Sequence, residues 1–337
     1  MWIDEFLSHC KRSGAGPSTI GIYRFVLKSI LVNHKLDLKR CSKTGLLKVL
    51  DVFTEDYSRS YQNFLAILIK RCLVFLDRKD LAMAVSVPKV GDRAGRIKEK
   101  LLSVDEVKRL IGEADNSQDR LLVELLSESG ARIGEIYNLR IKDVQFDEYG
   151  AILFLSGKSG TRPRRVYYSI PDLKKQINDH PQRSYPEARL FHYGYKHRAG
   201  EFHKVTLYNR IRRLGKIILG KNIHPHMFRH TRATEDSKYF TDRELMKLYG
   251  WRQPHMIEIY SHLSFRDVED KDLVLHGLKR KEEILKPLVQ VRKCPHCKED
   301  NAPVAMFCHK CSRSLTKQDM SDEELKEWVM KMVREAK

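Results

Sequence analysis

The sequence predicts a mainly α-helical protein with a small antiparallel β-sheet, built as two domains followed by a small metal-binding module. Apolar residues recur at helical spacing over most of the chain, one stretch alternates like a β-hairpin, and four cysteines gather near the C-terminus. The chain has 337 residues, of which 42% are hydrophobic, and this suffices for two ordinary cores. We therefore expect folded domains rather than extended disorder.

Residues 1–87 are predicted to form a small helical bundle. Apolar residues recur at helical spacing in PSTIGIYRFVLKSILVNH and in YSRSYQNFLAILIKRCLVFL, and the flanking Lys and Arg lie mostly off these stripes. This pattern is typical of a bundle with a basic outer face. The next segment, PKVGDRAGRIKEK at 88–100, is basic and contains a proline and two glycines, so it is predicted to be an exposed linker.

A second domain is expected over residues 101–285. SVDE at 103–106 and TDRE at 241–244 are capping-box signatures that mark the starts of helices. AILFLS and RRVYYSI, separated by GKSGTRP, alternate as the two strands of a hairpin. Further helices are expected at about 119–129, after GAR at 130–132, and near residues 171, 204, 226 and 255.

The charge balance favours a polyanionic partner. Lys and Arg total 63 against 44 Asp and Glu, a formal net charge of +19, and basic groups gain affinity by releasing counterions from phosphates. A merely basic soluble protein would show the same balance. No apolar run approaches the roughly 20 residues of a membrane span, and the start of the chain carries acids where a signal peptide is basic. We expect a cytoplasmic protein with no membrane partner.

Four stretches of the second domain are informative because of their order and spacing. They are GARIGE at 130–135, GKSGTRPRR at 157–165, HPHMFRHT at 224–231 and YGWRQPHMIEIYSHL at 249–263. Together they resemble the tyrosine recombinase family of the phage-integrase type, over about residues 1–285. The resemblance implies a helical core-binding domain followed by a catalytic domain that cleaves and rejoins DNA through a 3′-phosphotyrosine bond.

On this resemblance, Arg132 and Arg229 hold the non-bridging oxygens of one DNA phosphate while Tyr260 attacks the phosphorus. Two guanidiniums suit this task because they stabilise the extra negative charge of the transition state. Tyr239 and Tyr249 are rival nucleophiles by residue type, but neither has the family's distance from the tryptophan of the fourth stretch.

The leaving 5′ oxygen needs a proton, and the resemblance assigns this role to Lys158 on the hairpin turn. The glycines on either side allow a tight or mobile turn. Arg162, Arg164 and Arg165 lie in the same hairpin and compete for the role, but an arginine stays protonated and is a poor acid.

A phenol of pKa about 10 is a poor nucleophile at neutral pH and needs a proton acceptor. The resemblance makes His226 this general base, and its spacing of three residues from Arg229 places both on one helical face. His230 is expected to point elsewhere and to pack or cap. Trp251 stands where many members have histidine, and its N–H is expected to bind a phosphate oxygen, with buried packing as the alternative. Glu135 is either the partner of an active-site cation or a surface acid.

The resemblance implies a reaction that needs no cofactor and no catalytic metal. The phosphotyrosine bond conserves the energy of the broken strand, so ligation needs no ATP. Its partner is a double-stranded DNA recombination site, and the resemblance implies four protomers on two sites with a Holliday-junction intermediate. Residues 266–280 would dock onto a neighbouring subunit, or pack on their own domain. Integration or excision of a mobile element is the favoured role, and Xer-type resolution of chromosome or plasmid dimers is the alternative.

Other functions compete with this interpretation. A type IB topoisomerase shares the chemistry, but the two-domain layout resembles recombinases better. A DNA-binding regulator descended from a recombinase would have lost a catalytic residue, and all the expected groups are present. A zinc-ribbon transcription factor leaves the four stretches unexplained.

The clustered cysteines predict a structural zinc ribbon at 286–316. Cys294, Cys297, Cys308 and Cys311 form two C-x-x-C pairs separated by ten residues, and each pair can hold one side of a tetrahedral Zn²⁺. The ribbon would contact either DNA or protein. The last segment, 321–335, is predicted to be an amphipathic helix.

Overall fold

The computed structural model describes residues 2–89, 101–157, 160–192, 203–258, 260, 269, 272–278, 291–302 and 305–315. The chain divides into two compact units, Met1–Arg93 and Ala94–Lys337, each described here by itself. The division falls inside the predicted linker, most of which lies outside the described residues. Among the described residues, every helix is too short or too polar to cross a bilayer.

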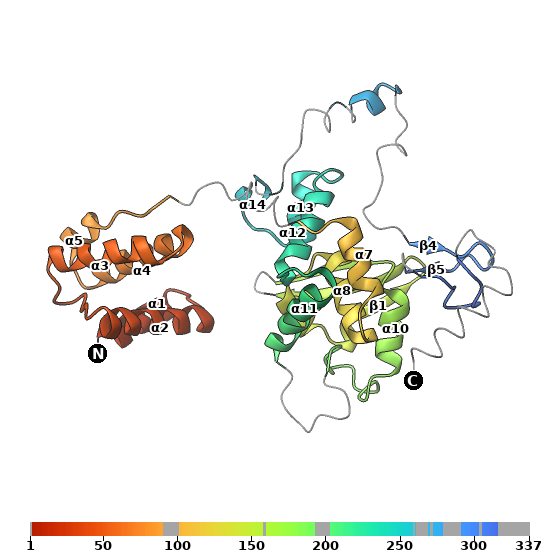
Figure 1. The fold of residues 1–337 in the computed structure, drawn as a ribbon, viewed down its shortest axis with the longest axis horizontal. Coiled ribbons are helices and arrows are strands. Elements are labelled where there is room, and N and C mark those ends of the chain that lie inside the picture. The colour runs from red at the N-terminus through yellow and green to blue at the C-terminus, as the bar shows by residue number, and fades with distance from the viewer. Residues whose placement is uncertain are drawn as a thin grey trace. The chain divides into compact units, whose positions relative to one another are not determined.

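The first unit is a bundle of helices, as the apolar periodicity predicts (Figure 1). Its helices are α1 (Trp2–Arg12), α2 (Pro17–Asn33), α3 (Lys43–Asp56), α4 (Arg59–Phe75) and α5 (Lys79–Ala84). Their apolar faces meet in one core, in which Ile3, Leu38 and Ile69 are fully buried. Burial of such side chains contributes roughly 1.5–3 kcal/mol each to folding.

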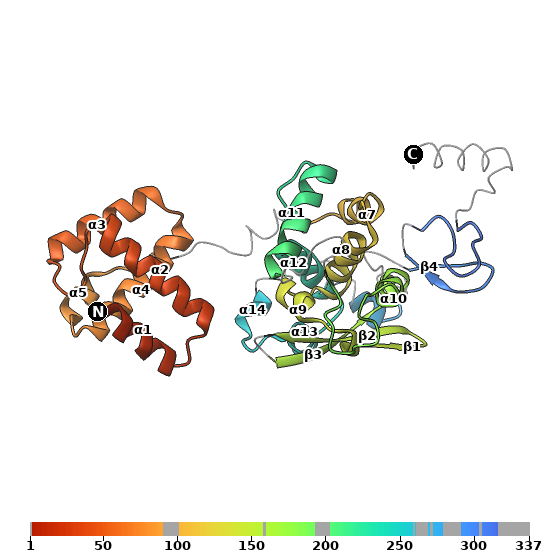
Figure 2. The ribbon, with the colours of Figure 1, turned by 90° about the horizontal axis from the view of Figure 1, so that it is seen from below.

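The larger unit packs helices against one side of a small sheet (Figure 2). Its helices are α7 (Val104–Gly112), α8 (Ser117–Ser129), α9 (Ile133–Asn138), the 3₁₀ turn η1 (Ile141–Asp143), α10 (Ile170–Asn178), α11 (Lys204–Leu219), α12 (Pro225–Asp236), α13 (Asp242–Tyr249) and α14 (His255–Glu258). Its core is centred on α8, where Leu121, Leu122 and Leu125 are fully buried. The mainly α fold class with a small antiparallel sheet is confirmed.

The sheet has three antiparallel strands in the order β1 (Val144–Asp147), β2 (Gly150–Gly157) and β3 (Gly160–Val166). The predicted hairpin is β2 with β3, but β1 was not predicted, because VQFD is short and mostly exposed. The predicted start of the second strand was wrong: β3 already begins at Gly160 and runs through Pro163, which pairs with Phe154. A proline fits there because β3 is an edge strand and needs no amide donor on its outer side.

Both predicted capping boxes are present. Ser103 and Glu106 cap α7 reciprocally, and Thr241 and Glu244 cap α13 in the same way. The helix predicted at about 119–129 is α8, which ends at Gly130 in the left-handed conformation with φ of 59°. This turn leads directly into Arg132, the N-cap of α9.

The cysteine-rich module contains a short antiparallel pair, β4 (Arg292–Lys293) with β5 (Asp300–Asn301). Its small core consists of Cys294, Cys308 and Leu315. The predicted helix at 321–335 lies outside the described residues, and the predicted docking segment at 266–280 is described only in part.

Candidate active site

Arg229 is the most buried charged group of the candidate site. It lies on α12, which begins with Pro225 at its first turn after the N-cap His224, and its side chain is 2% exposed. Its guanidinium donates to the carbonyl oxygens of Gly130 at 2.9 Å and Tyr249 at 2.8 Å. Burial, together with the charge of Arg132, lowers the pKa of Arg229 to about 10, so the group remains protonated at neutral pH.

Arg132 lies close enough to Arg229 for its charge to lower the pKa of that group, and it forms an ion pair with Glu135. The Glu135 carboxylate accepts from the Arg132 side chain at 3.0 Å and from its backbone N–H at 2.8 Å. Its other contact is the side chain of Arg162 at 2.9 Å. Although burial opposes ionisation of Glu135, the charge of Arg162 and the hydrogen bonds from Arg132 and Arg162 together lower its pKa. Glu135 therefore orients active-site cations, one of the two alternatives that the sequence left open.

The predicted nucleophile, Tyr260, is buried in an apolar cluster with Tyr249 and Trp251, with only 2% of its surface exposed. Its ring lies flat on Trp251, with 5.0 Å between centroids and 6° between planes, and Trp251 stacks in turn on Tyr249 at 4.9 Å. Burial raises the pKa of Tyr260, whereas the charges of Arg229 and Arg132 act in the opposite direction. The phenol, the indole and both guanidiniums thus belong to one cluster.

The hydroxyl of Tyr260 makes its hydrogen bond to Nδ1 of His230, at 2.8 Å. The expectation that His230 points away was wrong, because residues four apart on a helix share a face as closely as residues three apart. Its ring centroid lies 5.5 Å from that of Tyr260 and 5.5 Å from that of His226. The sequence signal that reveals it is the spacing of four in HMFRH.

His226 is the most exposed member of the cluster. Although its side chain reaches solvent, the surrounding protein partly desolvates the ring, and this effect together with the charge of Arg229 lowers the pKa of His226 and favours a neutral imidazole at physiological pH. It lies one helical turn before His230 on α12.

Lys158 lies outside the described residues, but the strands that carry its turn end beside the cluster. Gly157 and Gly160 form the last pair of the hairpin. A Cβ atom on Gly157 would lie 3.2 Å from Oε1 of Glu135. The last residue pair of the hairpin therefore lies next to the Glu135 carboxylate, which binds Arg132.

The three competing arginines of the hairpin are each bound to a carboxylate. Arg162 is bound to Glu135, and Arg164 binds Asp236 at 2.8 Å. Arg165 forms a bidentate pair with Asp147 at 2.6 Å. All three guanidiniums therefore form ion pairs within the protein.

Asp236 is the centre of a buried network next to the site, and no local pattern in the sequence predicts it. Its carboxylate binds Arg164 and Arg232, each at 2.8 Å, and accepts from the hydroxyl of Tyr249 at 2.7 Å. Burial acts to raise the pKa of Asp236, but the charges of Arg232 and Arg164 and the hydrogen bond from Tyr249 together lower it. Tyr249 is therefore a buried support of Trp251, fixed at both its ring and its hydroxyl.

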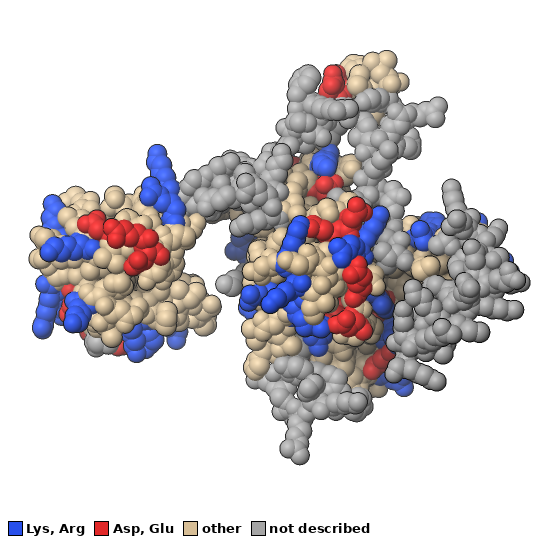
Figure 3. Space-filling view, viewed as in Figure 1, with Lys and Arg blue, Asp and Glu red and all other residues tan. Residues whose placement is uncertain are grey.

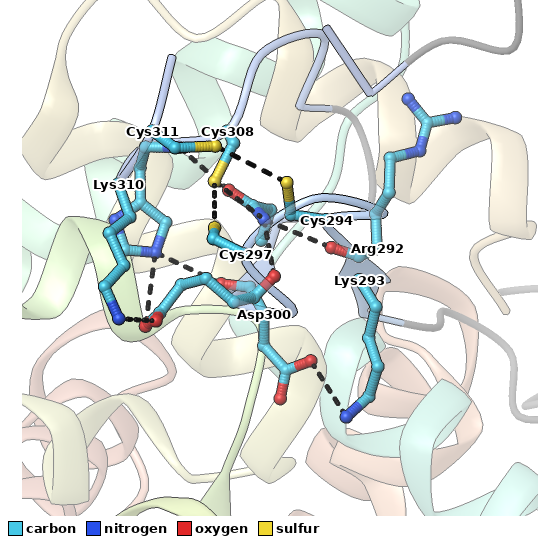
Figure 4. A network of polar contacts seen from close by, with 11 residues as sticks. Arg292, Lys293, Cys294, Cys297, Asp300, Cys308, Lys310 and Cys311 are labelled. Atoms are coloured by element: carbon cyan, nitrogen blue, oxygen red, sulfur yellow. Dashed lines mark hydrogen bonds and ion pairs between the residues drawn. The ribbon is translucent and has the colours of Figure 1, made fainter. Parts of the chain in front are cut away.

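The four predicted zinc ligands come together in the C-terminal module, with their sulfur atoms all within 4.8 Å of one another (Figure 4). Sγ of Cys294 lies 3.6 Å from that of Cys311, and Sγ of Cys297 lies 3.5 Å from that of Cys308. Tetrahedral Zn–S bonds of roughly 2.3 Å require S–S edges of about 3.8 Å, which fits this set.

Each cysteine pair closes the same kind of turn. The N–H of Lys298 donates to the carbonyl of Cys294 at 3.0 Å, and the N–H of Ser312 donates to that of Cys308 at 2.8 Å. Both donors have positive φ, 62° and 56°. Asn301, buried between the pairs, points its amide at the sulfur of Cys308 from 3.7 Å.

Comparison with known proteins agrees with this geometry. Residues 100–267 match the model of the phage integrase family. Two archaeal relatives are the tyrosine recombinase XerA of Pyrococcus horikoshii, 24% identical over 275 residues, and that of Thermococcus kodakarensis, 28% identical over 288. The first alignment covers 80% of this chain and 91% of the relative, and the second covers 82% and 96%.

Solved structures show the same fold at lower identity. The Tn1549 transposon integrase in complex with transposon right end DNA superposes with a TM-score of 0.61 at 16% identity, covering 82% of this chain and 99% of that one. The XerH site-specific recombinase bound to its difH substrate gives 0.59 at 18% identity, covering 81% and 84%.

The fold and the match to the phage integrase family define an enzyme that transfers DNA strands through a phosphotyrosine intermediate. More particularly, the chain belongs to the tyrosine recombinase family and catalyses site-specific recombination.

Proposed function

We propose that Tyr260 is the nucleophile and that one DNA phosphate binds against Arg132, Arg229, His226 and Trp251. The observation that carries this proposal is the buried phenol, which is hydrogen-bonded and stacked within the same cluster as both guanidiniums. Arg229 is pre-oriented by two backbone carbonyls and Arg132 by Glu135, so little reorganisation is needed when the phosphate gains charge.

In the proposed reaction, the Tyr260 oxygen forms a bond to phosphorus while the bond from phosphorus to the 5′ oxygen breaks. Arg132 and Arg229 neutralise the charge that develops on the non-bridging oxygens, and Trp251 donates to one of them. Lys158 gives its proton to the leaving 5′ oxygen. Ligation reverses these steps when the 5′-hydroxyl of the partner strand attacks.

A covalent-capture experiment tests the nucleophile. Nicked duplexes of randomised sequence are incubated with the wild type, and those captured as detergent-stable adducts provide the substrate. Tyr260→Phe should form no adduct, because it lacks the attacking oxygen, whereas Tyr239→Phe should form as much as the wild type. An equal adduct from Tyr260→Phe would remove the proposed nucleophile.

The general acid is tested by changing the leaving group. Lys158→Ala should slow cleavage of a normal 5′-oxygen substrate by about 100-fold or more, the usual contribution of a positioned acid. A 5′-thiolate leaves without a proton, so it should restore the rate of the variant. Arg165→Ala, which removes a neighbouring half-buried cation of the same hairpin, should need no rescue. A Lys158 variant that stays slow with the thiolate would assign the acid elsewhere.

We further propose that the enzyme acts in the cytoplasm on double-stranded DNA as a tetramer that recombines two sites. The net charge of +19 supports a DNA partner. On the face drawn in Figure 3, Lys and Arg gather over α11, which carries five of them. Structures of λ integrase include a tetramer bound to a Holliday junction, which supports the same assembly for this chain.

For its biological role we propose integration or excision of a mobile element. The cysteine module lies beyond residues 100–267, which match the family, and so adds a part that the shared catalytic domain does not need. Dimer resolution is a second candidate, because XerA relatives align over 91–96% of their own length. Resolution exchanges two identical sites and integration joins two different ones, so sequencing the exchanged junctions from a random library distinguishes the roles.

The cysteine module is proposed to hold one structural Zn²⁺ on its four thiolates. Support comes from the donor set, the sulfur spacing and the two matching turns. His296 and His309 lie inside the C-x-x-C pairs but are engaged elsewhere, with Arg313 and with the carbonyl of Asp300. Four protein ligands leave no open coordination position, so the ion would stabilise the fold rather than take part in the chemistry.

A further inference from the structure

Among the residues that the structure describes, His230 makes the closest polar contact to the reacting atom of the proposed nucleophile. Its Nδ1 lies 2.8 Å from the Tyr260 hydroxyl, and the two rings lie 5.5 Å apart with 32° between their planes. In the tautomer that carries its proton on Nε2, the Nδ1 atom of His230 is an acceptor, and the phenol donates to it. This is the arrangement that a proton acceptor requires before attack.

The surroundings of Tyr260 make such an acceptor necessary. The side chain is 2% exposed, which keeps bulk water away from the hydroxyl. Burial also raises its pKa, so a free phenolate is disfavoured until the proton has a destination. The nearby charged groups, Arg229 and Arg132, are donors that stabilise a phenolate but cannot take its proton.

The other members of the cluster are less well placed to accept this proton. Arg229 is committed to two backbone carbonyls, and the indole of Trp251 lies flat against the phenol ring and has no acceptor nitrogen. His226 is exposed, and its ring meets that of His230 at 5.5 Å. The three rings follow one another in the order His226, His230, Tyr260.

We propose that His230 accepts the phenol proton during DNA cleavage and returns it during ligation, while His226 binds the phosphate; this rests on Tyr260 as the nucleophile. As the Tyr260 oxygen bonds to phosphorus, the O–H electron pair stays with that oxygen and the proton passes to Nδ1 of His230. The departing 5′ oxygen takes its proton from a separate acid, Lys158 in the proposed mechanism. In ligation the imidazolium gives the proton back to the phenolate as the phosphotyrosine bond breaks.

A measurement without DNA tests the contact itself. A trifluorotyrosine is incorporated at position 260 of the full chain, and its ionisation is followed by ¹⁹F NMR over a range of pH. The titration midpoint should move when His230→Asn or His230→Phe is introduced, and should move less with His226→Asn. An unchanged midpoint in both His230 variants would overturn the proposal whether or not a DNA substrate is known.

Chemical rescue tests the proton transfer. Asn at position 230 keeps an oxygen near the place of Nδ1 but cannot take a proton, so His230→Asn should cleave selected nicked duplexes about 100-fold more slowly or worse. The acidic trifluorotyrosine at 260 ionises without help and should recover at least about tenfold of this loss. Rescue also shows that the variant is folded, and His226→Asn should not be rescued.

The outcomes separate this proposal from the proposed function. Wild-type cleavage by His230→Asn, or a slow variant that the acidic tyrosine does not rescue, overturns His230 as the acceptor while leaving Tyr260 as nucleophile. Rescue of His226→Asn instead returns the role to His226. If Tyr260→Phe still forms the adduct, the proposed function fails, and the NMR titration then decides on the contact alone.

Discussion

At the level of single residues, the candidate site is rigid because each charged group is held by fixed partners. Arg229 is bound by two backbone carbonyls, and Arg132 is bound by a carboxylate that a second arginine also holds. Removing one partner of a buried ion pair costs roughly 3–5 kcal/mol, because it leaves an uncompensated charge. Rigid donors of this kind stabilise a transition state without being reorganised during the reaction.

Trp251 carries the first prediction at this scale. Its ring is stacked between Tyr249 and Tyr260, and among the described residues its buried Nε1 has no hydrogen-bond acceptor. Trp251→Phe should keep the stack but lose the N–H that the proposed phosphate would accept. A hydrogen bond to a charged group is worth about 1.5–3 kcal/mol, so cleavage should fall by roughly 10- to 100-fold.

The matched control is Trp2→Phe in the first unit. The N–H of Trp2 already donates to Asp37 at 3.0 Å, so this variant should lose stability, measured by the urea midpoint, and retain the cleavage rate. Trp251→Phe should show the reverse pattern. Full cleavage by Trp251→Phe would show that the stacked ring alone is sufficient.

At the level of elements, the sequence predicted those features that are encoded by local spacing. The capping boxes at Ser103 and Thr241 and the hairpin were visible in it, because caps and alternation are short-range signals. The β1 strand was not, because four mostly exposed residues give no alternation signal and pair only through β2.

The same limit applies to the site. The family spacing named Arg132, Arg229 and Tyr260, and the structure brings these together. Glu135 binds two arginines and His230 contacts Tyr260 only because α9, α12 and β3 pack together. Contacts between segments distant in sequence cannot be predicted from the local sequence of any one segment. The hairpin arginines were ambiguous for the same reason, since each finds its carboxylate far away in the sequence or on another strand.

Helix α8 carries two buried glutamates, and burial raises the pKa of both, but they differ in their hydrogen-bond partners. Glu128 accepts hydrogen bonds from the backbone of Tyr168 at 3.0 Å and from the hydroxyl of Ser169 at 2.9 Å. Neither carboxyl oxygen of Glu124 has a hydrogen-bond partner among the described residues. Burial, with the nearby charge of Asp172, raises the pKa of Glu124 well above its ordinary value.

Glu124→Gln is therefore expected to stabilise the protein at neutral pH. Glu124 is protonated in the folded state, so folding must take up a proton wherever the unfolded chain has lost it. The free-energy cost of this uptake begins as pH rises above about 4.3, the ordinary pKa of glutamate, and it stops growing above the raised pKa of the folded state. Glutamine removes this cost, so the gain in the free energy of unfolding should be about 1 kcal/mol or more at pH 7 and should vanish near pH 4.

Urea unfolding of the wild type and the variant at several pH values measures this difference. Glu128→Gln is the matched control on the same helix. It places an amide N–H₂ against backbone donors and should destabilise the protein by about 1–3 kcal/mol. A Glu124→Gln variant that is less stable than the wild type at pH 7 would contradict the assignment of a protonated, unpartnered carboxyl.

At the level of the whole molecule, the described residues form several separate cores, each within one of the two units. The first unit, the catalytic core around α8 and the cysteine module each bury their own set of side chains. The module's core consists of two cysteines and one leucine, which is too little apolar surface to fold without a further crosslink. Its stability should therefore depend on metal, whereas the other cores should not.

Metal removal tests this division of the molecule. Plasma emission spectroscopy of the zinc-supplemented protein should find one zinc per chain, and none in Cys297→Ser treated with a mild chelator. Chelation of the wild type should make the segment around 291–315 sensitive to protease, while the unfolding midpoint of the larger core and adduct formation through Tyr260 change little.

Cys72→Ser, which alters a buried thiol of the first unit, should lower stability there and keep the zinc. If the chain binds no zinc, the proposed metal site is wrong. If chelation abolishes adduct formation through Tyr260, the catalytic core depends on the module and the two are not independent.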